Sequence, residues 1–145
     1  MVDIDSGQIG QVIQNLVLNA DQAMPQGGVI TICATNEKVF PDNDMHLQAG
    51  NYVKVMIKDE GVGIPEKDLT RIFDPYFTTK TTGNGLGLAS SYYTMKNHGG
   101  FIGVRSKPGN GSVFYLYLPV SQQQHIPRPK KNPPLTNGKG RILIM

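Results

Sequence analysis

Apolar and polar positions follow a helical period in the first part of the chain. Between residues 6 and 24, apolar side chains recur at steps of three and four, which predicts a helix with one buried face. They are Ile9, Ile13, Leu16, Ala20 and Ala23. Amide side chains follow the same period on a second face: Gln11, Asn15, Asn19 and Gln22. An amide stripe beside an apolar stripe indicates a helix that lines a polar cavity.

The rest of the pattern predicts mainly strands. Segments 29–35, 52–58, 101–106 and 112–118 are rich in β-branched, apolar and aromatic residues and are bounded by turn residues. Residues 86–97 predict a second long helix, and a short helix should start near Pro65. Residues 73–84 hold proline, threonine and glycine and predict a long loop, which in a compact domain is usually a functional lid.

The charge is unevenly distributed. The 145 residues carry a net charge of +3, but residues 121–145 contribute five basic residues and no acidic one, so residues 1–120 have a net charge of −2. The basic tail is rich in proline and lacks aromatic residues, which favours a solvated linker over a nucleic-acid-binding segment.

Composition also bounds the compartment. The single cysteine, Cys33, has no partner within the chain. No apolar run approaches the roughly 20 residues that span a bilayer, and the first residues lack the pattern of a signal peptide. We therefore expect a cytoplasmic domain, whose parent protein can still be anchored to a membrane through other segments.

A glycine-rich segment precedes the second long helix. Gly83, Gly85 and Gly87 open this helix, so its free N–H groups and dipole could hold phosphate oxygens. The spacing fits neither the dinucleotide fingerprint nor a P-loop. Taken alone, the segment is as consistent with a flexible turn as with a phosphate site.

Two further segments offer polar ligands. Asn15 and Asn19 lie one helical turn apart, and an asparagine carbonyl is a hard oxygen ligand of the kind that Mg²⁺ accepts. Asp59 follows an apolar strand and precedes the turn Gly61-Val-Gly63, where its carboxylate could accept a hydrogen bond from an adenine amine. Taken singly, these residues could be exposed asparagines and a turn-forming aspartate.

As a set, these motifs resemble the boxes of sensor histidine kinases. The segments that resemble the N box, the first glycine box, the F box, the second glycine box and the last box are Asn15-x-x-x-Asn19, Asp59-x-Gly61-x-Gly63, residues 72–77, Gly83-x-Gly85-Leu-Gly87-Leu88 and residues 109–114. The resemblance covers about residues 1–120. It implies a two-layer α/β sandwich of the Bergerat type, with a mixed sheet of about five strands, three helices on one face and a long ATP lid.

The resemblance also implies a role for each matching residue. It implies ATP and Mg²⁺ as cofactors, with Asn15, Asn19 and Lys80 as catalytic residues and Asn19 as the metal ligand. Phe73 and Phe77 would pack the lid between Gly63 and Gly85. The residues implied to bind the nucleotide are Asn15, Asn19, Asp59, Gly61, Gly63, Ile64, Lys80, Gly83, Gly85, Leu86, Gly87, Leu88 and Ser112.

Asn15 separates the branches of this superfamily. Hydrolysing relatives carry a glutamate at this position, and an amide cannot act as a general base on water. The site is therefore expected to hold ATP for transfer to a histidine in two-component signalling. A degenerate binding module and an ATPase of the same superfamily remain the alternatives.

The chain does not offer its own acceptor, because no acidic residue follows His46, His98 or His125. The resemblance implies that the acceptor histidine lies on a separate helix hairpin, through which the full-length protein forms a homodimer. This chain alone is expected to be monomeric and not to bind nucleic acid. Residues 121–139 are predicted to be a linker, and residues 140–145 resemble the beginning of a receiver domain, as in a hybrid kinase.

Overall fold

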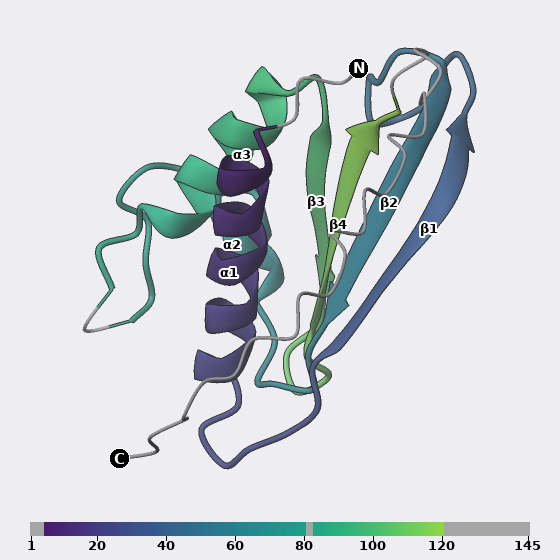
Figure 1. Cartoon of the computed structure of the whole chain (residues 1–145). Helices are drawn as coiled ribbons and strands as arrows, with labels where there is room; N and C mark the ends of the chain where they lie inside the picture. The colour runs from purple at the N-terminus through teal and green to yellow at the C-terminus, as the bar shows by residue number, and fades with distance from the viewer. Residues whose placement is uncertain (1–4, 81–82, 121–145) are drawn as a thin grey trace, which may run out of the picture.

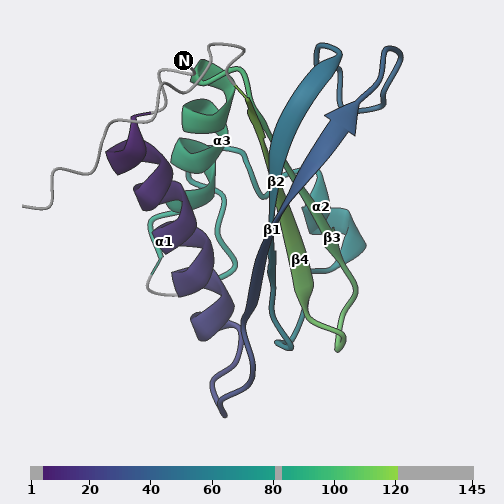
Figure 2. The same ribbon diagram turned by 45° about the vertical axis from the view of Figure 1, so that its right-hand side comes forward.

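Two helices cover one face of an antiparallel sheet. The computed structural model describes residues 5–80 and 83–120, in which four strands pair in the order β1-β2-β4-β3. Helices α1 and α3 lie side by side over this sheet, while the short α2 contacts the edge strand β3 (Figures 1 and 2). The elements are α1 (Ser6–Gln22), β1 (Thr31–Val39), β2 (Gly50–Lys58), α2 (Glu66–Leu69), α3 (Gly87–Asn97), β3 (Phe101–Ser106) and β4 (Ser112–Pro119).

Helix α1 is fixed by its cap and its apolar face. Asp5 is the N-cap, and its Oδ1 accepts hydrogen bonds from the N–H groups of Gly7 and Gln8 at 2.9 and 3.2 Å. The buried face consists of Ile9, Val12, Leu16 and Ala20. Ile13 and Ala23 of the predicted stripe are only half-buried. The predicted amphipathic helix is present, rotated slightly so that Val12 joins the core.

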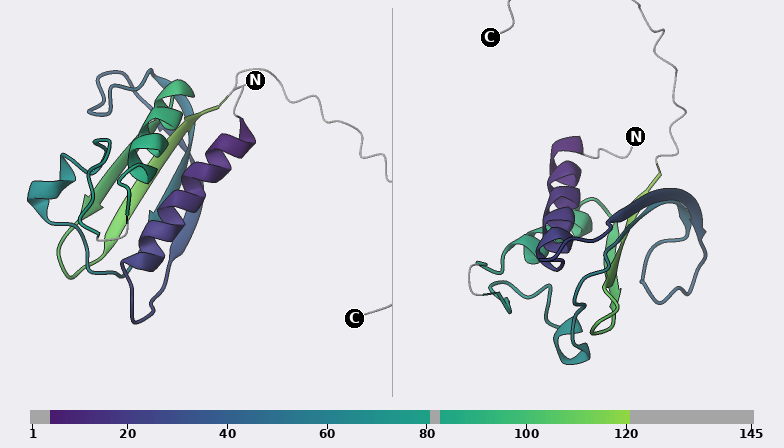
Figure 3. Two further views of the ribbon diagram at one scale, coloured as in Figure 1. Left: turned by 90° about the vertical axis from the view of Figure 1, so that its left-hand side faces the viewer. Right: turned by 90° about the horizontal axis from the view of Figure 1, so that it is seen from below.

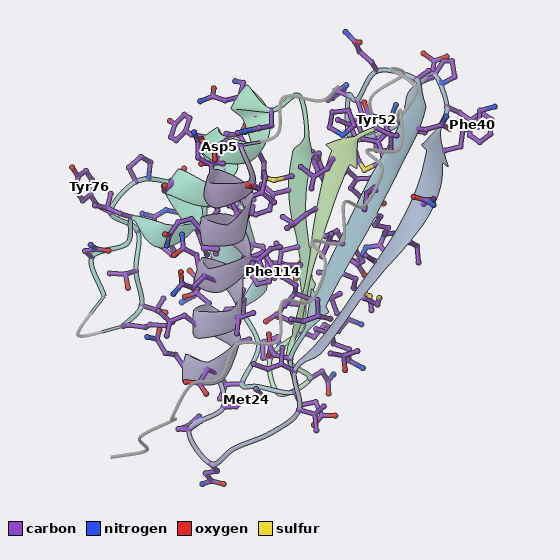
Figure 4. All side chains as sticks on the ribbon, in the orientation of Figure 1. Asp5, Met24, Phe40, Tyr52, Tyr76 and Phe114 are labelled. Carbon is purple, nitrogen blue, oxygen red and sulfur yellow. The ribbon has the colours of Figure 1, made fainter. Side chains whose placement is uncertain are left out.

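The core fills the space between the helices and one face of the sheet. Leu16 and Met95 from the helices and Ile57 and Leu116 from the strands are at most 1% exposed. Phe114 lies in the same layer (Figure 4). On the opposite face of the sheet, a smaller cluster forms around Tyr52, Tyr117 and Val39. Burial of the first set attaches both helices to the sheet.

The predicted α/β class is confirmed, but two details of the sheet differ. The sheet of the described residues is wholly antiparallel and has four strands, whereas the family resemblance implied a mixed sheet of about five. Hairpins join β1 to β2 and β3 to β4, and β2 pairs antiparallel with β4, so no parallel pair arises.

Strand β1 is also displaced from its predicted position. It was expected over residues 29–35 but extends from Thr31 to Val39 through the polar run Asn36-Glu-Lys. Eight of its nine residues are exposed or half-buried, because β1 is the sheet's outer edge and the helices do not cover it (Figure 3). Strand β1 is held in place by its backbone hydrogen bonds to β2 and not by a buried face. The apolar pattern of the sequence therefore predicted the end of this strand poorly.

Two turns meet at one end of the sheet. The N–H of Asp59 donates to Ser112 O at 2.9 Å, and the N–H of Gly109 donates to Val62 O at 2.8 Å. Gly111 has a φ of +73°, and a Cβ built on it would lie 2.0 Å from Asp59 O. The β3–β4 turn therefore contacts the end of β2 so closely that only glycine fits.

No helix of the described residues is long and apolar enough to cross a bilayer.

A pair of glycine substitutions tests this close contact. Gly111→Ala should destabilise the fold by more than about 3 kcal/mol, because it adds a backbone clash to a left-handed conformation. Gly109→Ala is the matched control, since Gly109 has a φ of +77° but nothing within 4 Å of a built Cβ. It should cost about 1–2 kcal/mol. Urea unfolding measures both, and equal losses would contradict the contact.

Candidate functional site

The predicted site residues converge on one cavity. It has a volume of about 610 Å³ and lies between α1, the start of α3, the turn after β2, and residues 77–80 and 83–85. The residues that were predicted to bind the nucleotide and that line this cavity are Asn15, Asn19, Asp59, Gly63, Ile64, Lys80, Gly83, Gly85, Gly87, Leu88 and Ser112. Gly61 and Leu86, also predicted to bind the nucleotide, do not line it. A cavity of this size is typical of small-molecule and cofactor sites.

Asp59 is the buried carboxylate of the cavity. It is 3% exposed, and its Oδ1 accepts hydrogen bonds from the N–H groups of Gly61 at 2.8 Å and Ser112 at 3.2 Å. Its Oδ2 accepts no hydrogen bond from residues 5–80 and 83–120. In these residues every fully buried side-chain polar atom has a hydrogen-bond partner, so Oδ2 is not fully buried. Oδ2 therefore faces the cavity and is available to a ligand.

Gly61 supports Asp59 from behind. A Cβ on Gly61 would lie 2.6 Å from Ala23 O, so the turn is pressed against the end of α1. The N–H of Val62 donates to the same carbonyl at 3.1 Å. Gly61 thus serves the site by fixing the carboxylate, and this explains why it is absent from the cavity wall.

The next part of the turn is attached to β3. The Ser106 hydroxyl accepts a hydrogen bond from the N–H of Ile64 and lies 2.8 Å from Gly111 O. Its Oγ is also 3.1 Å from Ser112 Oγ. Ser106 therefore joins the glycine turn to the β3–β4 turn, a role that its place in the sequence did not reveal.

Asn15 connects α1 to the start of α3. Its Nδ2 lies 3.3 Å from Gly87 O and 3.4 Å from Ser91 Oγ, while Ser91 Oγ donates to Gly87 O at 2.8 Å. Ser91 is completely buried. Asn15 Oδ1 accepts a hydrogen bond from Gln11 Nε2 at 3.3 Å. The amide of Asn15 thus holds the glycine-rich segment close to the polar face of α1.

Lys80 extends to the other end of that polar face. Its Nζ donates to Asn19 Oδ1 at 3.0 Å and to Gln22 Oε1 at 2.5 Å. The residue as a whole is exposed, but partial burial of the ammonium lowers its pKa. No carboxylate of the described residues lies within 4.0 Å of Nζ. Within the described residues, the cavity wall therefore carries a cation that forms no ion pair.

The glycine-rich segment ends in a helix that lacks a side-chain cap. Leu86 is the N-cap of α3 and makes no capping hydrogen bond through its side chain, which cannot accept one. Gly85 has a φ of +68°, and a Cβ built on it would lie 2.5 Å from the backbone of Tyr76. The turn thus brings the N-terminal end of α3 to the cavity, where its N–H groups favour an anion.

Apolar side chains form the rest of the wall. Ile64, Ile72, Phe77, Leu88 and Phe114 line the cavity and belong to or pack against the main core. Phe73, the other aromatic residue of the predicted F box, packs on the core and lies 5.7 Å from the Tyr92 ring. Tyr76, between them in the sequence, is 75% exposed and points outwards (Figure 4).

The donor set suits a hard cation only together with a ligand. No group of three or more His, Cys, Asp or Glu residues that could hold a metal occurs in the part of the chain that the structure describes. The candidate metal donor is the amide oxygen of Asn19, which accepts a hydrogen bond from Lys80 in this structure. Mg²⁺ characteristically takes one or two protein oxygens and completes its shell with water and substrate phosphates. The residues therefore fit Mg²⁺ bound together with a phosphorylated ligand.

Comparison with known proteins identifies the family. Residues 4–122 match the family described as histidine kinase-, DNA gyrase B-, and HSP90-like ATPases. The chain belongs to this family. It is similar to the sensor histidine kinase ZraS of Escherichia coli K12, with 41% identity over 127 residues that cover 88% of this chain and 25% of that protein. The chain thus spans a quarter of the length of this relative.

Solved structures support the same assignment. The catalytic domain of the histidine kinase ThkA has 36% identity and a TM-score of 0.61, over 79% of this chain and 68% of that one. Full-length ShkA, solved in complex with AMPPNP, has 27% identity and a TM-score of 0.62, over 79% of this chain and 22% of that one. The predicted resemblance is confirmed, and the chain is a histidine-kinase-type ATP-binding catalytic domain.

The hydrogen bond from Ile64 to Ser106 can be tested in this domain. Ser106→Ala leaves the half-buried N–H of Ile64 without its acceptor, which should cost about 1–3 kcal/mol and loosen the glycine turn. Amide exchange measured by NMR should accelerate at Ile64. Ser90→Ala, on the exposed face of α3, is the control and should change neither quantity. Unchanged exchange at Ile64 in the Ser106 variant would show that the hydroxyl does not hold the turn.

Proposed function

We propose that this domain binds Mg-ATP and donates the γ-phosphoryl group to a histidine of a separate helix hairpin in two-component signalling. In that transfer, the bond from the γ-phosphorus to the bridging oxygen breaks, a bond to an imidazole nitrogen forms, and ADP leaves. The observation that carries the proposal is the convergence of Asp59, Asn19, Lys80 and the start of α3 on one cavity.

The free oxygen of Asp59 is proposed to bind the adenine base. Its Oδ1 is already occupied by two N–H groups, so Oδ2 can accept a hydrogen bond from the exocyclic amine of adenine. Ile64, Leu88 and Phe114 supply apolar contacts to a flat ring. Gly63 and Ser112 also line the site.

The polar face of α1 and the start of α3 are assigned to the phosphates. Lys80 would meet them with its uncompensated charge, and the N–H groups following Gly85 would donate to their oxygens. Asn19 would hold Mg²⁺, which neutralises phosphate charge during transfer when it is bound. The complex of ShkA with AMPPNP, an ATP analogue, supports a nucleotide in this fold.

Asn15 favours transfer over hydrolysis. Its Nδ2 lies within 3.4 Å of Gly87 O and Ser91 Oγ, and a carboxamide has no basic group with which to accept a proton from water. ATP should therefore persist in the site until an acceptor arrives. The acceptor hairpin, the homodimer that it forms and a receiver domain after residue 140 are proposed for the parent protein. The tail that motivates the receiver lies outside the described residues.

Asp59→Asn tests the assignment of the base. The variant retains an oxygen for the N–H groups of Gly61 and Ser112 but presents an NH₂ group to the adenine amine. Because two donors then face each other and a charged acceptor is lost, ATP affinity should fall by about 100-fold. Calorimetry with Mg-ATP measures the change. Glu60→Gln removes the neighbouring exposed charge and should bind normally, whereas normal binding by Asp59→Asn would remove the assignment.

Transfer can be tested by adding the parent kinase's own hairpin in trans. With radiolabelled ATP, the hairpin should gain an acid-labile phosphoryl group on its histidine, because the transfer needs only positioning and charge stabilisation. A hairpin in which that histidine is replaced by alanine is the control. If the domain binds Mg-ATP but never labels the native hairpin, it is a degenerate binding module.

A further inference from the structure

Among the described residues, Lys80 is the one cation that lines the cavity, and Gln22 makes the shortest contact to it. Its Oε1 accepts a hydrogen bond from Lys80 Nζ at 2.5 Å, across 58 residues of sequence. Gln22 also lines the cavity, where it continues the polar stripe of Asn15 and Asn19 to the last turn of α1. The contact therefore joins the helix to the segment that carries Lys80.

We propose that Gln22 is a positioning residue that holds the Lys80 ammonium at the phosphate end of the site. The inference rests on the proposed function, because it assigns Lys80 to the phosphates. Gln22 itself is not a phosphate ligand in this scheme, since it offers its oxygen to the ammonium.

The two partners differ in rigidity. Gln22 ends a 17-residue helix whose last turn is closed by hydrogen bonds from the Ala23 N–H to Asn19 O and Ala20 O. Lys80 lies in a segment outside any helix or strand, where its N–H donates to Thr78 Oγ1 at 3.1 Å. A lysine side chain loses considerable rotamer entropy when it is ordered, and fixing it before the ligand arrives reduces the cost of binding. The helix thus supplies the fixed point that the loop lacks.

The neutrality of Gln22 is essential to the proposed role. A carboxylate at this position would form an ion pair with Lys80 and would neutralise the positive charge that is proposed to attract the phosphates. An amide oxygen aligns the ammonium but leaves its charge intact. The lowered pKa of Lys80, caused by burial, agrees with an ammonium that has no anionic partner.

Gln22 also differs from Asn19, which holds the same ammonium. Asn19 is the residue assigned to Mg²⁺, and one amide oxygen has limited room for both a metal ion and an ammonium. When Asn19 Oδ1 is taken by the metal, Gln22 Oε1 is the acceptor that still restrains Lys80. Gln22 should therefore matter most for ligands that carry phosphates.

A double-mutant cycle tests the proposal. Gln22→Met keeps the length of the side chain without the amide oxygen, and Lys80→Met keeps the aliphatic stem without the charge. Calorimetry with Mg²⁺ and AMPPNP should show about a five-fold loss for the first variant and a larger loss for the second. The double variant should bind no more weakly than Lys80→Met, because Gln22 acts only through Lys80. Gln14→Met, on the exposed face of α1, is the matched control.

Adenosine separates positioning from a structural effect. Its affinity should be the same in all the variants, because it has no phosphate for Lys80 to meet. Three results would each overturn the role of Gln22 while leaving a nucleotide site. They are additive losses of AMPPNP affinity in the double variant, losses of adenosine affinity equal to those for AMPPNP, and an unchanged AMPPNP affinity in Gln22→Met or Lys80→Met. A native domain that fails to bind AMPPNP at all would contradict the proposed function itself.

Discussion

The pair of hydrogen bonds accepted by Asp59 Oδ1 is the constraint on which the site depends. The two donors come from Gly61, in the turn after β2, and from Ser112, at the start of β4. One oxygen thereby fixes two turns at one end of the sheet, and it leaves the second oxygen for a ligand. Gly61 and Gly111 allow the backbones to approach closely enough, since a Cβ at either position would lie within 2.6 Å of a neighbouring backbone atom.

Helix α1 connects this constraint to the phosphate end of the site. Its apolar face is buried against the sheet, and its last turn supports the glycine turn through Ala23 O. Its amide face reaches the start of α3 through Asn15 and Lys80 through Asn19 and Gln22. One helix therefore positions the proposed base-reading and phosphate-binding groups relative to each other, and none of its amides carries a charge that would repel a nucleotide.

Much of this arrangement could be predicted from the sequence because its main elements are amphipathic. Helices α1 and α3, β3 and the core of β2 have one buried face each, so their apolar patterns located them to within about two residues. Strand β1 was displaced because it is exposed on both faces. The mixed sheet of about five strands came from the family resemblance, whereas residues 5–80 and 83–120 form four antiparallel strands. The cavity residues were found through the family resemblance, because the motifs are distinctive as an ordered set. Gln22 was placed on the amide stripe but its contact to Lys80 was not predicted, and Ser91 and Ser106 were missed, because their partners are distant in sequence and only the tertiary structure brings them together.

The central claim is that Asp59 Oδ2 reads the exocyclic amine of adenine. The affinity of the native domain for inosine triphosphate, relative to ATP, tests it most directly. Inosine triphosphate has the same phosphates and nearly the same ring, but a carbonyl oxygen replaces the amine and would face the carboxylate. Inosine triphosphate should bind at least about 100-fold more weakly than ATP in the presence of Mg²⁺. Equal affinities for the two nucleotides would contradict this role of Asp59, because the carboxylate would then take no part in recognising the base.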